Sequence, residues 1–418
     1  MFRLAFITIL LYVVSLSKTQ KVSDKNKNLR TLARWCCVNS KEYTKCEHWK
    51  IAHLAANQST ILLECIRATD KFDCFRHIFE DQADLMTADA GDVYTAGKYY
   101  NLVPISSEVY SSLIGSGYTD IYSVAVVKRK SEMSIQKLKG SNSCHGGVGT
   151  SAGWNVPIST LIEMKLLDIF DCNNHVKAAT KFFNKMCAPD ALNVQFNPTG
   201  DNPTNACELC IGKIGSTFCT NQDPYSGYIG ALYCLNDGGG DVAFVTHNAL
   251  TELASYNRSI NLNDYELLCP NFGNIANSPK TAPINDYLQC NWGKIPGRAV
   301  LTSGRKAIQQ RNDFKEFLRL SAKLFSGKSA SSVAAFYVYQ QTTTTTLKPF
   351  FLPWISQNQE SFDPFSLSMP AEIKAYKYYL FDSTEFGGRD LIFTDQTSSF
   401  QDIENNLNYV SFLNSKCK

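Results

Sequence analysis

Residues 143–154, SCHGGVGTSAGW, form a stretch whose residue types are compatible with three kinds of chemistry. Residues 149–153, GTSAG, match the pattern G-x-S-x-G, in which Ser151 would be the nucleophile of a hydrolase. Residues 147–152 match the dinucleotide-binding pattern G-x-G-x-x-A. As a whole, the stretch is a glycine-rich loop that enters a helix, where free backbone amides can hold a small anion.

Both enzyme patterns require an apolar strand that runs directly into the glycine-rich turn. The residues before the turn, KLKGSNSCH (137–145), are polar and contain glycine, so they predict no buried strand. His175 and His247 follow Ser151, as the histidine of a hydrolase would, but histidines at such separations occur in most chains. We therefore expect no enzymatic activity, and the anion-binding interpretation is kept.

The N-terminus has the features of a signal peptide. One basic residue, Arg3, precedes an apolar run over residues 4–16, which is too short to span a bilayer. We expect residues 1–19 to be the signal peptide and the mature chain to be secreted. No later segment has about 18 consecutive apolar residues, so we expect no membrane span.

Charge and cysteine content narrow the class of protein further. The net charge is +3 with intermixed signs and no basic stripe, which argues against a nucleic-acid partner. Fifteen cysteines in a secreted chain imply a disulfide framework with one cysteine left over. The triplets NQS (57–59) and NRS (257–259) are candidate glycosylation sites.

Short apolar segments alternate with amphipathic segments along the chain, which predicts an α/β architecture with mixed sheets covered by helices. The segments expected to be strands are 34–39, 122–130, 240–247 and 297–303. Those expected to be helices are 41–56, 72–81, 157–170, 175–186 and 311–325. Residues 338–372, with five consecutive threonines and scattered Pro, Ser and aromatics, differ in composition. We interpret them as a surface insertion, either a solvated loop or an O-glycosylated or partner-binding loop.

Taken together, six segments resemble the transferrin family, in order and approximate spacing. They are RWCCVNSKEYTKCEHW (34–49), LMTADAGDVYTAG (85–97), YSVAVVKRK (122–130), SCHGGVGTSAGWNVPI (143–158), GYIGALYCLNDGGGDVAFVTH (227–247) and DYELLC (264–269). The resemblance covers one lobe and nearly the whole mature chain except the insertion. It implies two α/β subdomains around a cleft, as in periplasmic binding proteins. We expect the first subdomain to comprise 20–118 and 296–418, and the second 119–295.

The resemblance also implies a set of disulfides that leaves Cys37 unpaired, as a buried thiol or as one end of an intermolecular bridge. The implied pairs are Cys36–Cys74, Cys46–Cys65, Cys144–Cys234, Cys172–Cys417, Cys187–Cys210, Cys207–Cys219 and Cys269–Cys290.

A transferrin lobe holds Fe³⁺ and carbonate with an Asp, two Tyr and a His, and two of these four positions are kept here. Asp89 and Tyr228 fall on ligand positions, whereas the other two fall on Ile121 and Arg298. An arginine cannot lose its proton to coordinate a metal. Tyr122 follows Ile121, but neighbouring residues of a strand point to opposite faces, so we expect Tyr122 to face away from the cleft.

The anion site that the resemblance implies is altered as well. The threonine and arginine that hold carbonate in the family fall on Gly146 and Thr150. The backbone amides of Ser151, Ala152 and Gly153 remain, and we expect them to bind an anion weakly at most. Two lysines that open some family members in acid fall on residues 246 and 394, which are threonines.

The sequence therefore predicts a secreted, monomeric, transferrin-like binding or interaction protein without high-affinity, carbonate-dependent Fe³⁺ binding. Its partner would be an extracellular protein or receptor. The alternative is a carrier of iron or another metal that uses Asp89, Tyr228 and non-family ligands. A further hypothesis is that Arg298 pairs with Asp89 and closes the lobe without metal.

Overall fold

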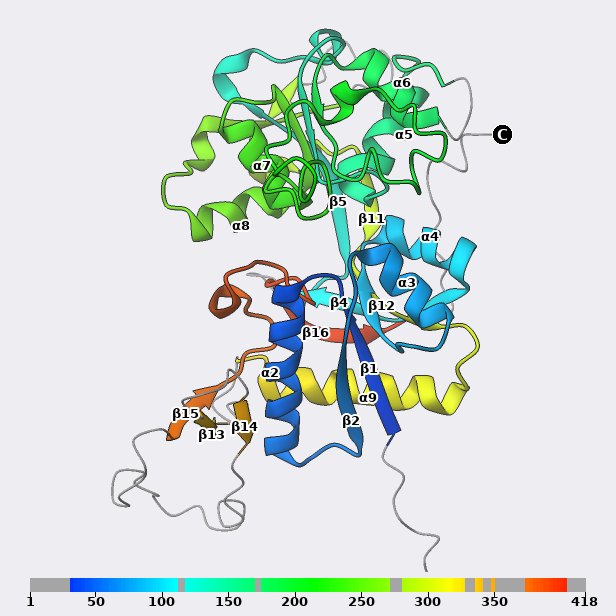
Figure 1. Ribbon diagram of the computed structural model, residues 1–418. Helices are drawn as coiled ribbons and strands as arrows, with labels where there is room; N and C mark the ends of the chain where they lie inside the picture. The colour runs from blue at the N-terminus through cyan, green and yellow to red at the C-terminus, as the bar shows by residue number, and fades with distance from the viewer. Residues whose placement is uncertain are drawn as a thin grey trace, which may run out of the picture.

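Two α/β halves lie one above the other in the computed structural model, and each is built around its own sheet (Figure 1). The structure describes residues 31–111, 117–169, 174–270, 280–327, 335–340, 347–349 and 373–403. The predicted α/β class with mixed sheets is confirmed, because parallel and antiparallel pairs occur within one sheet.

One half, named the seven-strand half, corresponds to the expected second subdomain and contains a sheet in which β5 is central. β5 pairs in antiparallel fashion with β8, β9 and β11, whereas β6 runs parallel to β8 and β7. Its strands are β5 (Asp120–Lys128), β6 (Ser143–His145), β7 (Met186–Cys187), β8 (Val242–Thr246), β9 (Tyr265–Leu268), β10 (Thr281–Ala282) and β11 (Gly293–Pro296). Its helices are the π-helix at Ser151–Asn155, α5 (Val156–Glu163), α6 (His175–Phe182), α7 (Gly227–Asn236) and α8 (Ala249–Tyr256).

The other half, named the four-strand half, corresponds to the expected first subdomain. It combines an antiparallel sheet of order β16-β4-β12-β3 with the parallel pair β1-β2. The strands are β1 (Thr31–Cys37), β2 (Ile61–Arg67), β3 (Met86–Ala88), β4 (Leu102–Tyr110), β12 (Ala299–Ser303) and β16 (Thr397–Asp402). The helices are α2 (Ser40–Ala56), α3 (Lys71–Phe79), α4 (Ala90–Tyr100) and α9 (Ile308–Phe325).

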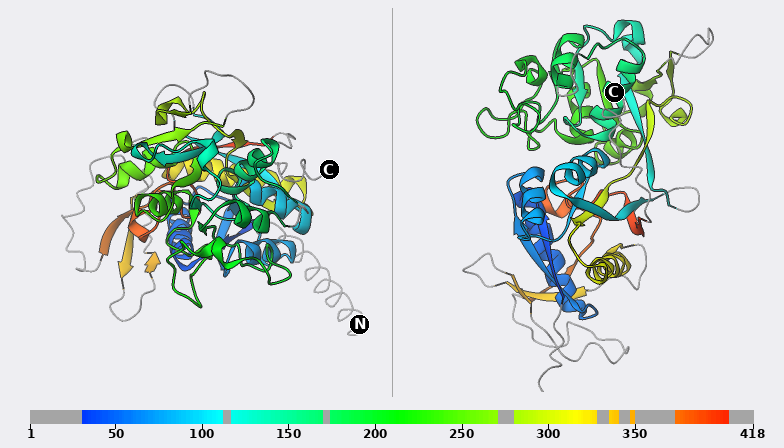
Figure 2. Two further views of the ribbon diagram at one scale, coloured as in Figure 1. Left: turned by 90° about the horizontal axis from the view of Figure 1, so that it is seen from above. Right: turned by 90° about the vertical axis from the view of Figure 1, so that its right-hand side faces the viewer.

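The chain crosses between the halves along β5 and returns along β11 to β12, and the side view shows the paired strands β5 and β11 at one edge (Figure 2). Each half buries its own apolar residues: one cluster lies in the seven-strand half, and two lie in the four-strand half. The domain boundaries at 119 and 295 stay a prediction.

Side-chain caps fix where three helices of the four-strand half begin. Asn39 accepts from the backbone N–H of Glu42 at α2, and Asp70 accepts from that of Asp73 at α3. Asp89 accepts from that of Gly91 at α4. A carboxylate or amide at this position satisfies a backbone donor that the helix itself cannot. The caps of α2 and α4 both line the cleft described below.

Six of the seven expected disulfides are present in the structure: Cys36–Cys74, Cys46–Cys65, Cys144–Cys234, Cys187–Cys210, Cys207–Cys219 and Cys269–Cys290. The seventh, Cys172–Cys417, lies outside the described residues. Cys37 is buried and has no disulfide partner among the described cysteines. Burial raises the pKa of its thiol well above the ordinary value, so the reactive thiolate is disfavoured.

The predicted elements differ from the observed ones mainly at their ends. The helix expected over 157–170 ends at Glu163, and Lys165 then adopts a left-handed conformation with φ 56°. Within the expected insertion, β13 (Ala335–Gln340), β14 (Leu347–Pro349) and β15 (Ile373–Lys377) form a small antiparallel sheet. Residues 341–346 and 350–372 lie outside the described chain. Over the parts that the structure describes, no helix combines the length and apolar character needed to cross a membrane.

Candidate functional site

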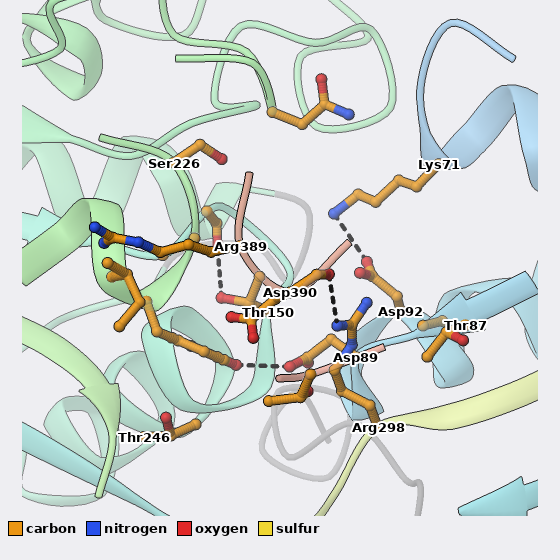
Figure 3. A pocket seen from close by; sticks show the side chains of 18 of the residues that line it. Lys71, Thr87, Asp89, Asp92, Thr150, Ser226, Thr246, Arg298, Arg389 and Asp390 are labelled. Atoms are coloured by element: carbon orange, nitrogen blue, oxygen red, sulfur yellow. Dashed lines mark hydrogen bonds and ion pairs between the residues drawn. The ribbon is translucent and has the colours of Figure 1, made fainter. Parts of the chain in front are cut away.

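A cavity of about 310 Å³ lies in the cleft between the two halves and brings the predicted site residues together. Asp89, Arg298 and Asp390 line it from the four-strand half. Ile121, Gly146, Thr150 and Tyr228 line it from the seven-strand half, and the charged residues converge around the middle (Figure 3).

Asp89 is held at the N-terminus of α4 and contacts the other side of the cleft. Its Oδ1 accepts hydrogen bonds from Gly91 N at 2.9 Å, Ser151 N at 2.7 Å and Ser151 Oγ at 2.7 Å. Its Oδ2 accepts the hydroxyl proton of Tyr228 at 2.6 Å. The carboxylate of Asp89 therefore occupies the helix start where the family resemblance implies a bound anion.

Tyr228, at the start of α7, uses its hydroxyl twice. It donates to Asp89 and accepts from Ala152 N at 3.3 Å. Burial and the neighbouring Asp89 raise the pKa of Tyr228 well above the ordinary value, so the phenol keeps its proton. A Cβ atom built on Gly146 would lie 2.9 Å from Cδ1 of Tyr228. The absence of a side chain at residue 146 thus makes room for the Tyr228 ring in this position.

Ile121 and Tyr122 lie on opposite faces of β5, as the alternation of side chains predicted. Ile121 lines the cavity. The ring of Tyr122 packs against His247 and Tyr287, with ring centroids 5.7 and 5.6 Å apart. Tyr122 therefore does not replace the missing tyrosine ligand.

The hypothesis that Arg298 pairs with Asp89 is wrong. Nε of Arg298 lies 4.0 Å from Oε1 of Glu108, and Nη1 donates to the Asp390 carbonyl at 3.5 Å. Burial acts to lower the pKa of Arg298, but Glu108 and Asp390 outweigh it and raise the pKa, so the guanidinium stays charged. These partners belong to the same half as Arg298, because residue 298 directly precedes β12, which pairs with β4. The arginine stabilises the four-strand half and does not bridge the cleft.

The loop before the π-helix has little capacity left for an external anion. Oγ1 of Thr150 donates to the Gly147 carbonyl, and the amides of Ser151 and Ala152 are taken by Asp89 and Tyr228. The expected weak anion site over residues 150–153 is therefore occupied by side chains of the protein itself. Thr246 and Thr394, which fall on the two lysine positions, line the cavity from opposite halves.

Two further groups of side-chain contacts, named the cross-cleft seams, join the halves. The sequence analysis predicted neither of them. At one edge, Nζ of Lys71 forms ion pairs with Asp92 at 2.9 Å and with Asp190 of the other half at 3.6 Å. Burial would lower the pKa of Lys71, but the two carboxylates outweigh it and raise the pKa. At the other edge, α8 and its N-cap residue Asn248 contact residues 389–396 through the side-chain hydrogen bonds Asn248–Gln396, Gln396–Glu252 and Tyr256–Asp395. Tyr233 of α7 adds a hydrogen bond with Arg389.

Neither the hydrolase pattern nor an alternative metal cluster gains support from the geometry. Ser151 donates to Asp89, and no hydrogen bond joins it to a histidine among the described residues. Among the described residues, one group of His, Cys, Asp or Glu ligand atoms is compact enough to hold a metal: Cys187, Cys210 and Asp223. The two cysteines form a disulfide with each other, so they offer no thiolate for a metal.

Comparison with known proteins relates the chain to the transferrins. The Transferrin family model matches residues 33–348. Transferrin 2 of Drosophila melanogaster is 36% identical over 321 residues, which are 75% of this chain and 38% of that protein. Ovotransferrin of Gallus gallus is 36% identical over 283 residues, which are 67% of this chain and 37% of that protein. Melanotransferrin of Homo sapiens is 34% identical over 277 residues, which are 64% of this chain and 35% of that protein. The matched part is therefore less than two fifths of each of these relatives.

Proposed function

Because the chain belongs to the transferrin family, we propose that it is a secreted transferrin-like binding protein whose cleft closes on itself rather than on iron. In this proposal, high-affinity, carbonate-dependent binding of Fe³⁺ is lost. The closed lobe would serve as a surface for an extracellular protein or receptor. Family membership supports iron binding in general, but the side chains in the cleft of this chain argue against it.

The hydrogen bond of 2.6 Å between Tyr228 and Asp89 carries the proposal. These two residues occupy the kept ligand positions. The oxygen atoms that would bind a metal instead hydrogen bond with each other and with the anion loop (residues 146–153). To bind Fe³⁺, Tyr228 would have to lose a proton whose pKa is raised, and Asp89 would have to leave two backbone amides. Ile121 and Arg298 offer no replacement ligand, and the charge of Arg298 opposes a cation in the same cavity.

The residues present thus do not fit a ferric carbonate complex. Hard trivalent iron prefers several anionic oxygens. Here Asp92 and Asp190 of the cavity form ion pairs with Lys71, Asp390 accepts from the backbone N–H of Asp395, and Arg298 next to them keeps its positive charge. The alternative, a weak carrier that uses Asp89 and Tyr228 with ligands from elsewhere, requires these contacts to open first.

A titration with ferric nitrilotriacetate in bicarbonate buffer separates the two functions, because iron bound to a tyrosinate gives a visible charge-transfer band. We expect no band and no rise in the thermal midpoint of the purified protein. A band that saturates near one equivalent, together with a higher midpoint, would establish the carrier and refute the proposal. A matched sample of the Tyr228→Phe variant identifies the tyrosine if a band is seen.

A further inference from the structure

We propose that Glu252 and Asp390 share a proton across the cleft and form a latch that holds the two halves together at neutral pH and releases them as the pH rises. The latch is separate from the Asp89–Tyr228 contact and from the question of iron. It lies at the edge of the cavity where α8 of the seven-strand half meets residues 389–396 of the four-strand half.

The contacts around Glu252 place it firmly at this boundary. Its Oε2 accepts from Nε2 of Gln396 at 3.2 Å, and Gln396 in turn accepts from Nδ2 of Asn248 at 2.6 Å. Nearby, Tyr256 donates to Asp395 at 3.0 Å. The backbone N–H of Asp395 donates to Oδ1 of Asp390 at 2.9 Å. Glu252 and Tyr256 of α8, together with its N-cap residue Asn248, thus bond to one short segment of the opposite half.

Two buried side-chain atoms at this boundary, Oε1 of Glu252 and Oδ1 of Asn248, have no hydrogen-bond partner, and the first gains one if a proton is added to the carboxyl. Oε1 of Glu252 is buried and accepts no hydrogen bond, and the residue is only 6% exposed. Asp390 lines the same cavity as Glu252, and a hydrogen bond between the two carboxyl groups is one cause of the raised pKa of Glu252. Two buried carboxylates without a proton would repel each other, whereas a protonated Glu252 donates to Asp390 and satisfies the orphaned atom.

The charges that surround the pair lead to the same conclusion. Five carboxyl groups and three cations form one connected network from α2, β4, α8, residue 298 and residues 389–395. The carboxyl groups outnumber the cations, so the network favours bound protons. The charged and titratable groups that interact with the pair are Lys45, Glu108, Tyr118, Tyr256, Arg298, Arg389 and Asp395. Glu42 and Asp382 interact in turn with Lys45.

The direction of the pH effect follows from where the proton binds. Burial, followed by Asp390 and Asp395, raises the pKa of Glu252 from 4.5 to about 10 in the closed lobe. If opening exposes the carboxyl and restores its ordinary pKa, closing takes up one proton between these two pH values. The closure constant then falls by at most about tenfold per pH unit in this window, and it is independent of pH below about 4.5. Asp395, whose pKa is raised to about 6, acts in the same direction at lower pH.

Small-angle X-ray scattering of the mature chain with EDTA at pH 5.5, 7.0 and 9.0 tests the latch. We expect the radius of gyration to be constant from pH 5.5 to 7.0 and to increase at pH 9.0. Glu252→Gln should stay compact at pH 9.0, since a neutral amide donates to Asp390 at every pH. Lys45, whose pKa is lowered to about 8, is unchanged in this variant, so its own titration cannot account for the difference.

Glu266→Gln on β9 is the matched control and should follow the wild-type profile. Should Glu252→Gln fail to fold by circular dichroism, Asp390→Asn makes the same test on the other partner. A wild-type radius that does not change with pH would overturn the proposal, as would equal expansion of the wild type and the folded glutamine variant. If calcium chloride in place of EDTA abolishes the expansion, the pair holds a cation rather than a proton, and the proposal is also wrong.

Discussion

Asp89 and Tyr228 extend from opposite halves of the protein and meet in a hydrogen bond of 2.6 Å. In the ligand set that the family resemblance implies, a metal ion would lie between these two side chains. Here the tyrosine hydroxyl reaches the carboxylate directly, and Asp89 also caps the π-helix of the other half. The two residues that occupy kept ligand positions therefore bond to each other and join the two halves across the cleft.

Removing the hydroxyl of Tyr228 should weaken the protein with no metal present. Tyr228→Phe deletes the donor to Asp89 and the acceptor for Ala152, both in a partly buried site, which costs roughly 1–3 kcal/mol of unfolding free energy. Urea denaturation in EDTA measures the change. Tyr99→Phe, at a residue that is 64% exposed, is the control and should leave the midpoint unchanged. Equal midpoints for all three proteins would show that the Tyr228 hydroxyl stabilises nothing.

A methyl group at Gly91 should keep the halves apart. A Cβ at residue 91 would lie 2.0 Å from the Gly149 carbonyl oxygen of the other half, and that atom is backbone. Alanine itself favours the helix by about 1 kcal/mol, so α4 should not unfold. We expect faster hydrogen exchange over residues 146–155 in Gly91→Ala than in the wild type.

Gly97→Ala is the control within the same helix. Its Cβ would meet only the Leu102 carbonyl, at 3.5 Å, which is an ordinary contact. Exchange over residues 146–155 should therefore match the wild type in this variant. Identical exchange in the two alanine variants would contradict the close approach of α4 to the anion loop.

Much of the fold could be predicted because it depends on local patterns. The strands expected over 122–130 and 297–303 and the helix expected over 41–56 were each found within three residues of their predicted bounds. The partner of Arg298 could not be predicted, since it depends on how β4 lies beside β12. A signal was present: Glu108 is the single charge in the strand LVPISSEVY and is fully buried. A lone carboxylate in an apolar strand requires a partner, and Arg298 provides it.

The cross-cleft seams were beyond sequence reasoning for a different reason. Lys71 and Glu252 are ordinary charged residues on helices, and Asp190 and Asp390 are ordinary aspartates in loops, so the neighbouring sequence does not distinguish them. Only the approach of the two halves makes them neighbours. The family resemblance correctly placed Asp89 and Tyr228 in the cleft, but whether their ligand atoms face a metal or each other is decided by distances of a few ångströms.

Acid should destabilise the folded protein through its buried histidines. Burial lowers the pKa values of His53, His145 and His247 from 6.5 to about 4. A histidine whose folded pKa lies below its unfolded pKa stabilises the fold above pH 6.5, and the stabilisation is lost as the pH falls towards 4. At pH 5 the loss is about 2 kcal/mol for each histidine.

His53→Phe tests this dependence with little change in packing. The His53 ring stacks on Phe317 with centroids 4.7 Å apart, and its Nδ1 atom has no hydrogen-bond partner. We expect the unfolding free energy of the variant to fall less between pH 7 and pH 5 than that of the wild type. Parallel pH profiles would mean that His53 titrates normally in the folded state.

The central claim is that the lobe closes without metal, and scattering at pH 7.0 tests it most directly. The radius of gyration of the wild type should match the closed structure in EDTA. It should not change when the chelator is replaced by ferric nitrilotriacetate and bicarbonate. A lobe that is expanded in EDTA and contracts on adding iron would contradict the account, because closure would then require the metal.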